Sequence, residues 1–323
     1  MDTQIRVLIV GLGQIGMQYD QHLPLQQHVY SHCRAFSSHP AFCLVGAVDA
    51  SPQQRAVFES RYSSPAFERV EQALDALEAD LVIIATPTAN HFACLRTVLQ
   101  LVKPMAILCE KPLSYHLDEA REMVELCHQR STKLFVNYMR RSDPGVIAIK
   151  DRLLDGRIEC PVKGFVWYSK GLIHNGSHFF NLLQYWLGDF VDHTPIHRLR
   201  ELEHGDCDLD FKADFQRGEV VFLALDPTRY AHYAVELMAP NGRLRYEGAG
   251  HSLSWSPAED NPEFQGSRLI AEQPLEIFSG MKRFQFNVAA QINAALKEDI
   301  FYLSQGEDAL ATMECLSLII GQK

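Results

Sequence analysis

An apolar strand followed at once by a glycine-rich turn is the feature that most constrains the fold of this chain. The run 5–10 leads directly into Gly11-Leu12-Gly13-Gln14-Ile15-Gly16. In a strand-turn-helix of this kind the first glycine allows the tight turn, the second lets the backbone approach a pyrophosphate, and the third lets the helix pack closely on the strand. The pattern predicts a dinucleotide-binding turn, with an ordinary strand-to-helix turn as the alternative. The expected cofactor contacts in this turn are Gly11, Gly13, Gln14, Ile15 and Gly16.

The first 140 residues alternate short apolar runs with helical patterns. Five of these runs are predicted strands, at 5–10, 44–48, 81–85, 105–109 and 134–137. Short, continuously apolar strands that helices separate are typical of a parallel sheet covered on both faces. We therefore predict an α/β fold in which residues 1–140 form a doubly wound parallel sheet.

After residue 141, segments of alternating hydrophobicity replace the continuous apolar runs. Five of them are predicted strands of a largely antiparallel sheet, at 162–169, 208–215, 219–225, 233–238 and 243–247. Asn241-Gly242 is predicted to form a hairpin turn, and residues 256–273 a long surface loop. Helices are predicted at 144–154, 177–187, 281–296 and 307–319. Residues 141–323 are thus expected to form a second α/β domain.

Asp49 closes the second predicted strand, where a carboxylate accepts hydrogen bonds from the adenosine ribose hydroxyls. This position favours NAD over NADP, because the carboxylate would repel a 2′-phosphate. NADP stays possible if Arg55 turns its guanidinium toward the ribose. The interval from Gly16 to Asp49 is 33 residues, longer than the ~20 that are usual. The excess lies in 19–32, which either borders the active site or forms a surface loop.

The chain is acidic, with a formal net charge of -10. Residues 1–142 contain 13 Lys and Arg against 14 Asp and Glu, whereas 143–323 contain 17 against 26, so the surplus lies in the second half. This balance argues against nucleic acid as a partner, because proteins that bind phosphate backbones carry basic patches. The densest acidic part, between Glu201 and Asp214, is predicted to be a solvated surface rather than a cation site.

Three sequence features bear on where the protein resides. The apolar runs are strand-sized and fall short of the roughly 20 residues that span a bilayer, so no membrane segment is expected. The N-terminus, with Asp2 and Arg6 around a very short apolar segment, is unlike a secretory signal. The eight cysteines are scattered without a C-x-x-C pair, which fits a reducing compartment. We expect a cytoplasmic protein.

Lys111 follows the fifth predicted strand within Cys109-Glu110-Lys111-Pro112. The carboxyl edge of an open α/β sheet is where such folds bind their ligands. Pro112 keeps Lys111 out of helical geometry and presents its side chain at a fixed kink. Beside a positively charged nicotinamide the ammonium would be disfavoured, so the lysine is suited to exchange a proton. The alternative is a solvated loop lysine.

The chain resembles a known family at three motifs: the glycine-rich turn, Ala85-Thr86-Pro87-Thr88-Ala89-Asn90-His91, and Glu110-Lys111-Pro112. Together they are similar to the GFO/IDH/MocA oxidoreductases, and the resemblance covers essentially the full chain. It implies an N-terminal Rossmann domain that binds NAD(P), and a C-terminal domain whose open sheet makes oligomer contacts in a homodimer or homotetramer. The further cofactor contacts that it implies are Thr86, Pro87, His91, Glu110 and Lys111.

A second family motif, D-x-G-x-H with Asp or Asn three residues later, falls on His174-Asn175-Gly176-Ser177-His178 and Asn181. His178 and Asn181 match, whereas His174 replaces an acidic residue, which shifts proton transfer toward Lys111 and His178. No metal site is expected, because Gly176 separates the two histidines and no third ligand is suitably spaced. The predicted substrate contacts, including two arginines of the crossover stretch 137–144, are Lys111, Arg140, Arg141, Lys170, Asn175, His178 and Asn181.

These features lead to one functional hypothesis. We expect reversible oxidation of a secondary alcohol on a sugar or nucleotide-sugar, with Lys111, His178 and His174 as catalytic residues. Lys111 would exchange the hydroxyl proton while His178 holds the hydroxyl in line. The second motif also resembles members in bacterial surface-polysaccharide sugar synthesis. Two alternatives stay open: a non-catalytic NAD(P)-responsive regulator, and a reductase of a non-sugar substrate such as a dihydrodiol or tetrapyrrole.

Overall fold

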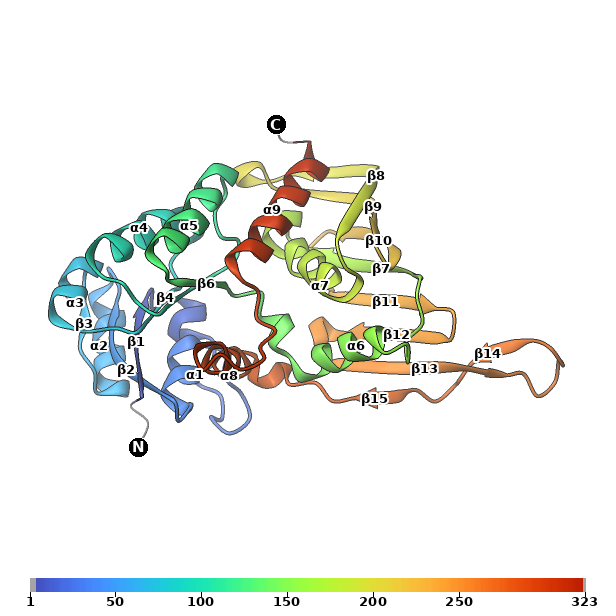
Figure 1. Cartoon of the computed structure of the whole chain (residues 1–323), viewed down its shortest axis with the longest axis horizontal. Coiled ribbons are helices and arrows are strands. Elements are labelled where there is room, and N and C mark those ends of the chain that lie inside the picture. Colours follow the sequence, from blue (N-terminus) through green and yellow to red (C-terminus); the bar gives the residue numbers. More distant parts are fainter. Residues whose placement is uncertain (1–3, 322–323) are drawn as a thin grey trace. The chain divides into compact units, whose positions relative to one another are not determined.

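The computed structural model describes residues 4–321, which form two compact units (Figure 1). We call the residues up to Ser142, together with Lys282–Ala311, the N-terminal unit. Asp143–Met281, together with the residues from Thr312 on, form the C-terminal unit. The sequence-based division placed everything after residue 140 in a single domain. The structure differs, because the chain returns to the N-terminal unit over Lys282–Ala311.

Helix α8 (Phe284–Leu296) explains this return. It buries Val288, Ala289, Ile292 and Ala295 completely, in one apolar cluster with side chains of the N-terminal sheet and of α1. Burial of four apolar side chains removes enough surface from water to fix the helix there. The amphipathic pattern of 281–296 predicts a helix, but it does not identify which sheet receives the apolar face.

The N-terminal unit contains a six-stranded parallel sheet in the order β3-β2-β1-β4-β5-β6. Its strands are β1 (Ile5–Val10), β2 (Phe42–Val48), β3 (Ala66–Phe67), β4 (Leu81–Ile84), β5 (Ala106–Cys109) and β6 (Lys133–Val136). The order is that of the doubly wound Rossmann fold, with its crevice at the switch between the β2 and β4 sides of β1. The predicted parallel sheet is confirmed, and the strand that the sequence did not predict, β3, has only two residues.

Helices connect the strands of this sheet and cover it. They are α1 (His32–Ser38), α2 (Pro52–Tyr62), α3 (Val70–Ala76), α4 (His91–Leu101) and α5 (Leu117–Arg130). Helix α2 has an N-cap typical of α-helices: the Ser51 hydroxyl accepts a hydrogen bond from the amide of Gln54, and Pro52 is the first helical residue.

The glycine-rich turn opens into a helical segment of only five residues, Gln14–Gln18. Residues 19–31, which we call the insertion segment, separate it from α1. The segment is mostly exposed at 21–27, whereas Asp20, Val29 and Ser31 are buried. Asp20 closes it: one carboxylate oxygen accepts from the Ser31 hydroxyl at 2.7 Å, and the other accepts from the amides of Tyr30 and Ser31. The segment therefore has a surface tip and a fixed, buried base.

The C-terminal unit contains a nine-stranded sheet in the order β14-β13-β12-β11-β7-β10-β9-β8, with β15 paired to β13. Its strands are β7 (Val162–Ser169), β8 (Phe190–Glu201), β9 (Cys207–Phe215), β10 (Gly218–Leu225), β11 (Ala234–Ala239), β12 (Gly242–Glu247), β13 (Ser252–Asp260), β14 (Arg268–Ile270) and β15 (Leu275–Ile277). β7 and β10 are parallel and the other pairs are antiparallel, which confirms the predicted largely antiparallel sheet.

Two turn and loop predictions in this unit are wrong. Residues 256–273 do not form a single loop, since they include most of the paired strands β13 and β14. The β11–β12 turn is centred on residues 240–241, because Ala239 pairs with Gly242. Gly242 lies inside the strand, where an added Cβ would stand 2.4 Å from the Trp255 ring. This glycine therefore serves close packing rather than the turn.

Three helices lie against one face of the C-terminal sheet (Figure 1): α6 (Pro144–Leu154), α7 (Ser177–Leu187) and the end of α9 (Gly306–Ile320). α6 and α7 have the predicted bounds. Residues alternate between buried and partly buried along β9, β10 and β12, so one face of the sheet forms the core and the other is more accessible. Among residues 4–321, no helix is long and apolar enough to cross a membrane.

Candidate functional site

The three glycines of the N-terminal turn have distinct surroundings. Gly11 has a φ of +102°, and an added Cβ would lie 2.6 Å from the carbonyl of Ala85. A Cβ on Gly16 would lie 2.0 Å from the Gly11 carbonyl oxygen, whereas a Cβ on Gly13 would meet nothing within 4 Å. Gly11 and Gly16 are therefore required by packing and backbone geometry, and Gly13 faces open space. An open approach to bare backbone at the second glycine is what a bound pyrophosphate needs.

Asp49 connects the end of β2 to this turn. Its carboxylate accepts hydrogen bonds from the amide of Leu12 at 2.7 Å and from the amide of Ser51 at 2.8 Å. Arg55 donates through Nη1 to the carbonyl oxygens of Asp49 and Ala50. The predicted ribose-binding carboxylate thus follows β2, and the arginine that would tolerate a 2′-phosphate lies at the start of α2 and reaches back to the Asp49 backbone.

Thr86 and His91 connect the glycine-rich turn to the segment Glu110-Lys111-Pro112, which we call the lysine loop. The Thr86 hydroxyl is buried and has no hydrogen-bond partner among the described residues, so it is available to a ligand of the turn. His91 is completely buried: Nε2 lies 2.9 Å from the Thr86 carbonyl oxygen, and Nδ1 lies 3.1 Å from that of Pro112. Burial lowers the pKa of His91 despite these carbonyl contacts. The imidazole joins two loops, and its burial leaves no surface for the direct cofactor contact that the family motif implies.

Lys111 follows β5 at the carboxyl edge of the parallel sheet and is half-buried. The peptide bond between Lys111 and Pro112 is cis. The preceding residue, Glu110, is buried and anchors the loop: its Oε1 accepts from His32 Nε2 at 2.8 Å and from Asn137 Nδ2 at 2.6 Å. Its Oε2 accepts the amide of Lys111 at 3.4 Å. α1, β5 and the end of β6 therefore meet at one carboxylate.

Glu110 stays ionised in this setting. Burial acts to raise the pKa of Glu110, but the hydrogen bond from His32, the Asn137 amide and the nearby charge of Lys111 outweigh it. The pKa is held below its ordinary value. A negative charge beside the Lys111 amide is thus a permanent part of the loop near neutral pH.

His32 is a partner of the Glu110 carboxylate that the sequence does not predict. It is fully buried at the first position of α1, directly after the insertion segment and its N-cap Ser31. The only signal in the sequence was the extra length of 19–32, whose position the sequence left open. The structure shows that the end of this stretch reaches the Glu110 carboxylate.

The two arginines of the crossover stretch occupy a short helical turn, Met139–Ser142. Arg140 is buried, and Arg141 makes an ion pair with Asp308 at 3.1 Å between Nη1 and Oδ2. The Arg141 guanidinium therefore already pairs with a carboxylate at the N-terminal end of α9, and it is less suited to bind an anionic group of a substrate. Arg140 stays a predicted substrate residue.

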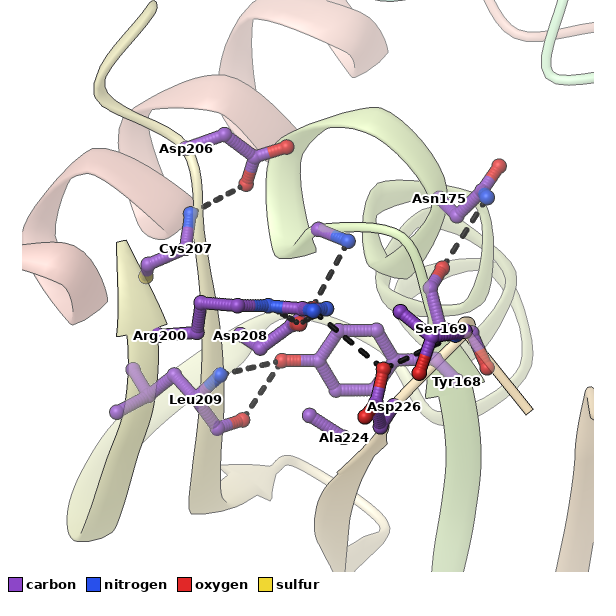
Figure 2. A network of polar contacts seen from close by, with 12 residues as sticks. Tyr168, Ser169, Asn175, Arg200, Asp206, Cys207, Asp208, Leu209, Ala224 and Asp226 are labelled. Atoms are coloured by element: carbon purple, nitrogen blue, oxygen red, sulfur yellow. Dashed lines mark hydrogen bonds and ion pairs between the residues drawn. The ribbon is translucent and has the colours of Figure 1, made fainter. Parts of the chain in front are cut away.

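The second motif lies in the C-terminal unit, on a loop and the helix that follows it. Residues Leu172–Gly176 form one π-helical turn, with His174 exposed and Asn175 half-buried. Asn175 Nδ2 donates to the Ser169 carbonyl, as Figure 2 shows, and to the Tyr233 hydroxyl, each at 3.1 Å. Lys170, just before the turn, is exposed. The loop thus presents Lys170 and His174 on its outer side while Asn175 secures it to β7.

His178 and Asn181 lie on the first turns of α7 and are both buried. Asn181 Nδ2 donates to the Thr312 hydroxyl at 3.1 Å. The Asn181 side chain is 1% exposed, so its contact with α9 accounts for its presence without a substrate. The structure therefore divides the predicted residues into two sets: Lys111, Arg140 and Arg141 belong to the N-terminal unit, and Lys170 to Asn181 belong to the C-terminal unit.

The prediction of a solvated acidic surface is wrong for its central members. Asp206 and Asp208 are 7% and 2% exposed. Their carboxylates accept hydrogen bonds from amides of the loop that carries the second motif. Burial raises the pKa of Asp206, although three backbone hydrogen bonds act in the opposite direction. Across residues 4–321 there is no group of three or more His, Cys, Asp or Glu that could hold a metal ion.

The strand order, the glycine turn and the residues around it define the N-terminal unit as a dinucleotide-binding Rossmann unit. Residues 5–138 match the GFO_IDH_MocA family, described as an oxidoreductase family with an NAD-binding Rossmann fold. This range contains all three sequence motifs that resemble the family, so the N-terminal unit is similar to the NAD-binding Rossmann domain of that family.

Several known proteins are similar to this chain. Inositol 2-dehydrogenase from Rubrobacter xylanophilus is 29% identical over 174 residues, which are 54% of this chain and 46% of that protein. Inositol 2-dehydrogenase from Rhizobium meliloti is 26% identical over 203 residues, 57% of this chain and 56% of that protein. The chain thus spans about half the length of these curated relatives.

A solved structure matches over nearly the whole length. The WlbA dehydrogenase from Bordetella pertussis, crystallised in complex with NADH and UDP-GlcNAcA, superimposes with a TM-score of 0.74. The match covers 98% of this chain and 95% of that chain at 18% identity. At this identity the similarity shows a shared fold, and it extends through both units.

Proposed function

We propose that this protein is an NAD(P)-dependent oxidoreductase that transfers a hydride between the nicotinamide and a secondary alcohol or ketone carbon of a sugar or nucleotide-sugar. The observation that carries the proposal is the anchored Glu110-Lys111-Pro112 loop at the carboxyl edge of the sheet. Contacts through Ala85, Thr86 and His91 connect it to the glycine turn within one unit. A lysine fixed beside a dinucleotide turn is suited to exchange a proton while the cofactor exchanges a hydride.

The residues around the turn fit NAD(P). Gly13 leaves room for a pyrophosphate, and the buried Thr86 hydroxyl offers an unused hydrogen-bonding group. Asp49, which accepts from the Leu12 amide of the turn, is proposed to bind the ribose hydroxyls. Asp49 favours NAD, and Arg55 at the start of α2 leaves NADP as a second cofactor. When bound, the nicotinamide supplies the hydride acceptor or donor.

The chain's own residues supply the proton chemistry and the positioning. In the oxidative direction Lys111 Nζ accepts the hydroxyl proton as the C–H hydrogen leaves with its electron pair, and in the reductive direction it returns the proton to the carbonyl oxygen. Glu110, held by His32 and Asn137, fixes the Lys111 backbone. His178 is proposed to orient the reacting hydroxyl and His174 to share in proton transfer.

Three observations support a sugar or nucleotide-sugar substrate. The relatives from Rubrobacter and Rhizobium are named inositol dehydrogenases, and the Bordetella structure contains UDP-GlcNAcA. Lys170 and Arg140 bring positive charge to a chain whose net charge is -10, as a diphosphate or carboxylate group requires. We place the reaction in the synthesis of a surface-polysaccharide sugar.

Oligomeric state and compartment belong to the same proposal. The accessible face of the C-terminal sheet supports assembly into a homodimer or homotetramer. All eight cysteines are free, which supports a reducing cytoplasm. Nucleic acid and membrane are not among the proposed partners.

The test is a turnover assay on the purified protein with NAD or NADP and a panel of myo-inositol, UDP-GlcNAc and UDP-GlcNAcA, followed by nicotinamide absorbance. One substrate should be turned over. Lys111→Ala should lower kcat by about a hundredfold or more, with unchanged NADH affinity. Lys103→Ala, at an exposed lysine of the same unit, is the matched control and should behave like the wild type.

Two results would favour the alternatives. Binding of NADH without turnover of any panel member, together with capture of a specific protein, would favour a non-catalytic regulator. Turnover of a dihydrodiol or tetrapyrrole in preference to every sugar would favour the non-sugar reductase.

A further inference from the structure

We propose that Asp206 and Asp208 are positioning residues for substrate binding. Asp206, just before β9, and Asp208, near the start of β9, clamp the loop Lys170–Gly176, so that Lys170 and His174 are presented in one fixed arrangement. The proposal rests on the proposed function, because that function assigns these loop residues to the substrate. Neither aspartate belongs to the sequence motifs, and both were predicted to be solvated.

The clamp consists of carboxylate contacts to loop amides, and Figure 2 shows the two carboxylates. Asp206 Oδ1 accepts from the amide of Ile173 at 2.8 Å, and Asp206 Oδ2 accepts from that of His174 at 3.0 Å. Asp208 Oδ1 accepts from the amide of Gly171 at 2.9 Å. The amides at the start of a helical turn have no backbone acceptor of their own. The two aspartates therefore supply acceptors that the loop cannot provide.

The loop needs this support because its backbone is strained at the entry to the turn. Lys170 has a φ of +65°, which is uncommon for a residue with a side chain. Gly171 follows with a φ of +88°, and a Cβ there would lie 2.1 Å from Asp206 Oδ2. The glycine thus allows both the conformation and the close approach of the carboxylate. Without the clamp, Lys170 would relax to an ordinary conformation and move its ammonium.

A local separation of strands brings the two aspartates to the loop. The β9–β10 pairing ends where Phe211 faces Phe222. Beyond that point side chains bridge the gap: the Tyr168 hydroxyl donates to the Leu209 carbonyl at 2.7 Å and accepts from the Leu209 amide at 2.9 Å. Asp210 accepts from the Ala224 amide at 2.8 Å. Because β9 leaves β10 here, its first residues reach the loop that follows β7.

The two carboxylates differ in how their charge is balanced. Arg200 donates to Asp208 from Nε at 2.9 Å, and its Nη2 makes a second, shorter contact. Asp206 makes no ion pair within the described part of the chain, and its acceptor atoms face the three backbone amides of Ile173, His174 and Cys207. An Asn at position 206 would place an NH2 group against a backbone N–H. The Asp206→Asn substitution is therefore the sharper probe of the clamp.

The test compares Asp206→Asn and Asp208→Asn with the matched control Asp214→Asn on the same strand, where the carboxylate pairs with Lys212 rather than with the loop. Hydrogen exchange is measured for the amides of residues 170–176. Both clamp variants should increase exchange there by about tenfold or more, since a charge-assisted acceptor is lost. The control should leave it unchanged. Equal exchange in wild type and both clamp variants would overturn the proposal.

Kinetics then distinguish positioning from a merely structural role. With the panel substrate that the wild type turns over, the clamp variants should raise KM about tenfold with a smaller change in kcat, and NADH affinity should stay within about twofold. An unchanged KM would overturn the positioning role. If the wild type turns over no panel member, the proposed function fails, while amide exchange still tests the clamp. If both clamp variants fail to fold, the wild type alone tests the clamp: fast hydrogen exchange at the amides of Gly171, Ile173 and His174 would overturn the proposal.

Discussion

Replacement of His32 by Phe tests how the insertion segment supports the lysine loop. The substitution keeps a buried ring in α1 but removes the 2.8 Å hydrogen bond from Nε2 to Glu110. The carboxylate keeps its bond from Asn137 and loses one charge-assisted donor, which costs about 2–3 kcal/mol. Phe also removes the buried Nδ1, which has no hydrogen-bond partner among the described residues and offsets part of this loss. We expect a net destabilisation of about 2 kcal/mol.

The assay is urea unfolding of the purified protein, with thermal unfolding as a second readout. A loss of about 2 kcal/mol corresponds to a decrease in Tm of roughly 4–8 °C for a unit of this size. His116→Phe, at an exposed histidine of the same unit, is the control and should stay within about 0.5 kcal/mol of wild type.

A double-mutant cycle with Glu110→Gln isolates the contact itself. If His32 acts through Glu110, the two changes should be non-additive by about 1–2 kcal/mol. Additive effects, or a His32→Phe protein as stable as the wild type, would refute the reasoning. The His32→Phe variant should also lower kcat without a matching change in KM, because His32 holds Glu110 and Glu110 holds the Lys111 backbone.

Four further variants test separate parts of the account. Gly13→Ala should fold like the wild type, but its methyl enters the open space where the pyrophosphate would lie, so NADH titration should show a loss of affinity. Gly16→Ala should lose about 1–3 kcal/mol of stability in an unfolding experiment, because its methyl clashes with the Gly11 carbonyl. The pKa of Glu110 is lower in the folded protein than in the unfolded chain, so its ionisation stabilises the fold above pH 4.5. This contribution disappears as the pH falls through the folded-state pKa. The difference in unfolding free energy between wild type and Glu110→Gln should therefore shrink in acid. Asp49→Asn should shift cofactor preference toward NADP by roughly tenfold in a competition titration, since the repulsive carboxylate is removed.

The parallel sheet and the glycine turn were predictable because their signals are local. Each apolar run in the first 140 residues corresponds to a strand within two residues at either end, and Gly11 and Gly16 are required by contacts inside the turn itself. The same holds for α6 and α7, whose apolar period and flanking residues determine their bounds.

The features that escaped prediction depend on partners distant in the sequence. His32 meets Glu110 from 78 residues away, and Asp206 is buried because the loop from Gly171 to His174 lies against it. The acidic composition between Glu201 and Asp214 predicts a solvated surface, because the sequence does not show which segments pack against these carboxylates. Similarly, α8 has an apolar face that fits either sheet, and only tertiary packing assigns it to the N-terminal unit.

The central claim is that Lys111 exchanges the substrate proton, and amine rescue of Lys111→Ala tests it most directly. Single-turnover hydride transfer would be followed with the substrate that the wild type uses, in the presence of a series of small primary amines. The account predicts that the variant binds NADH normally, transfers hydride about a hundredfold more slowly or worse, and recovers rate with amine concentration and basicity. A variant that transfers hydride at the wild-type rate without added amine would contradict the claim.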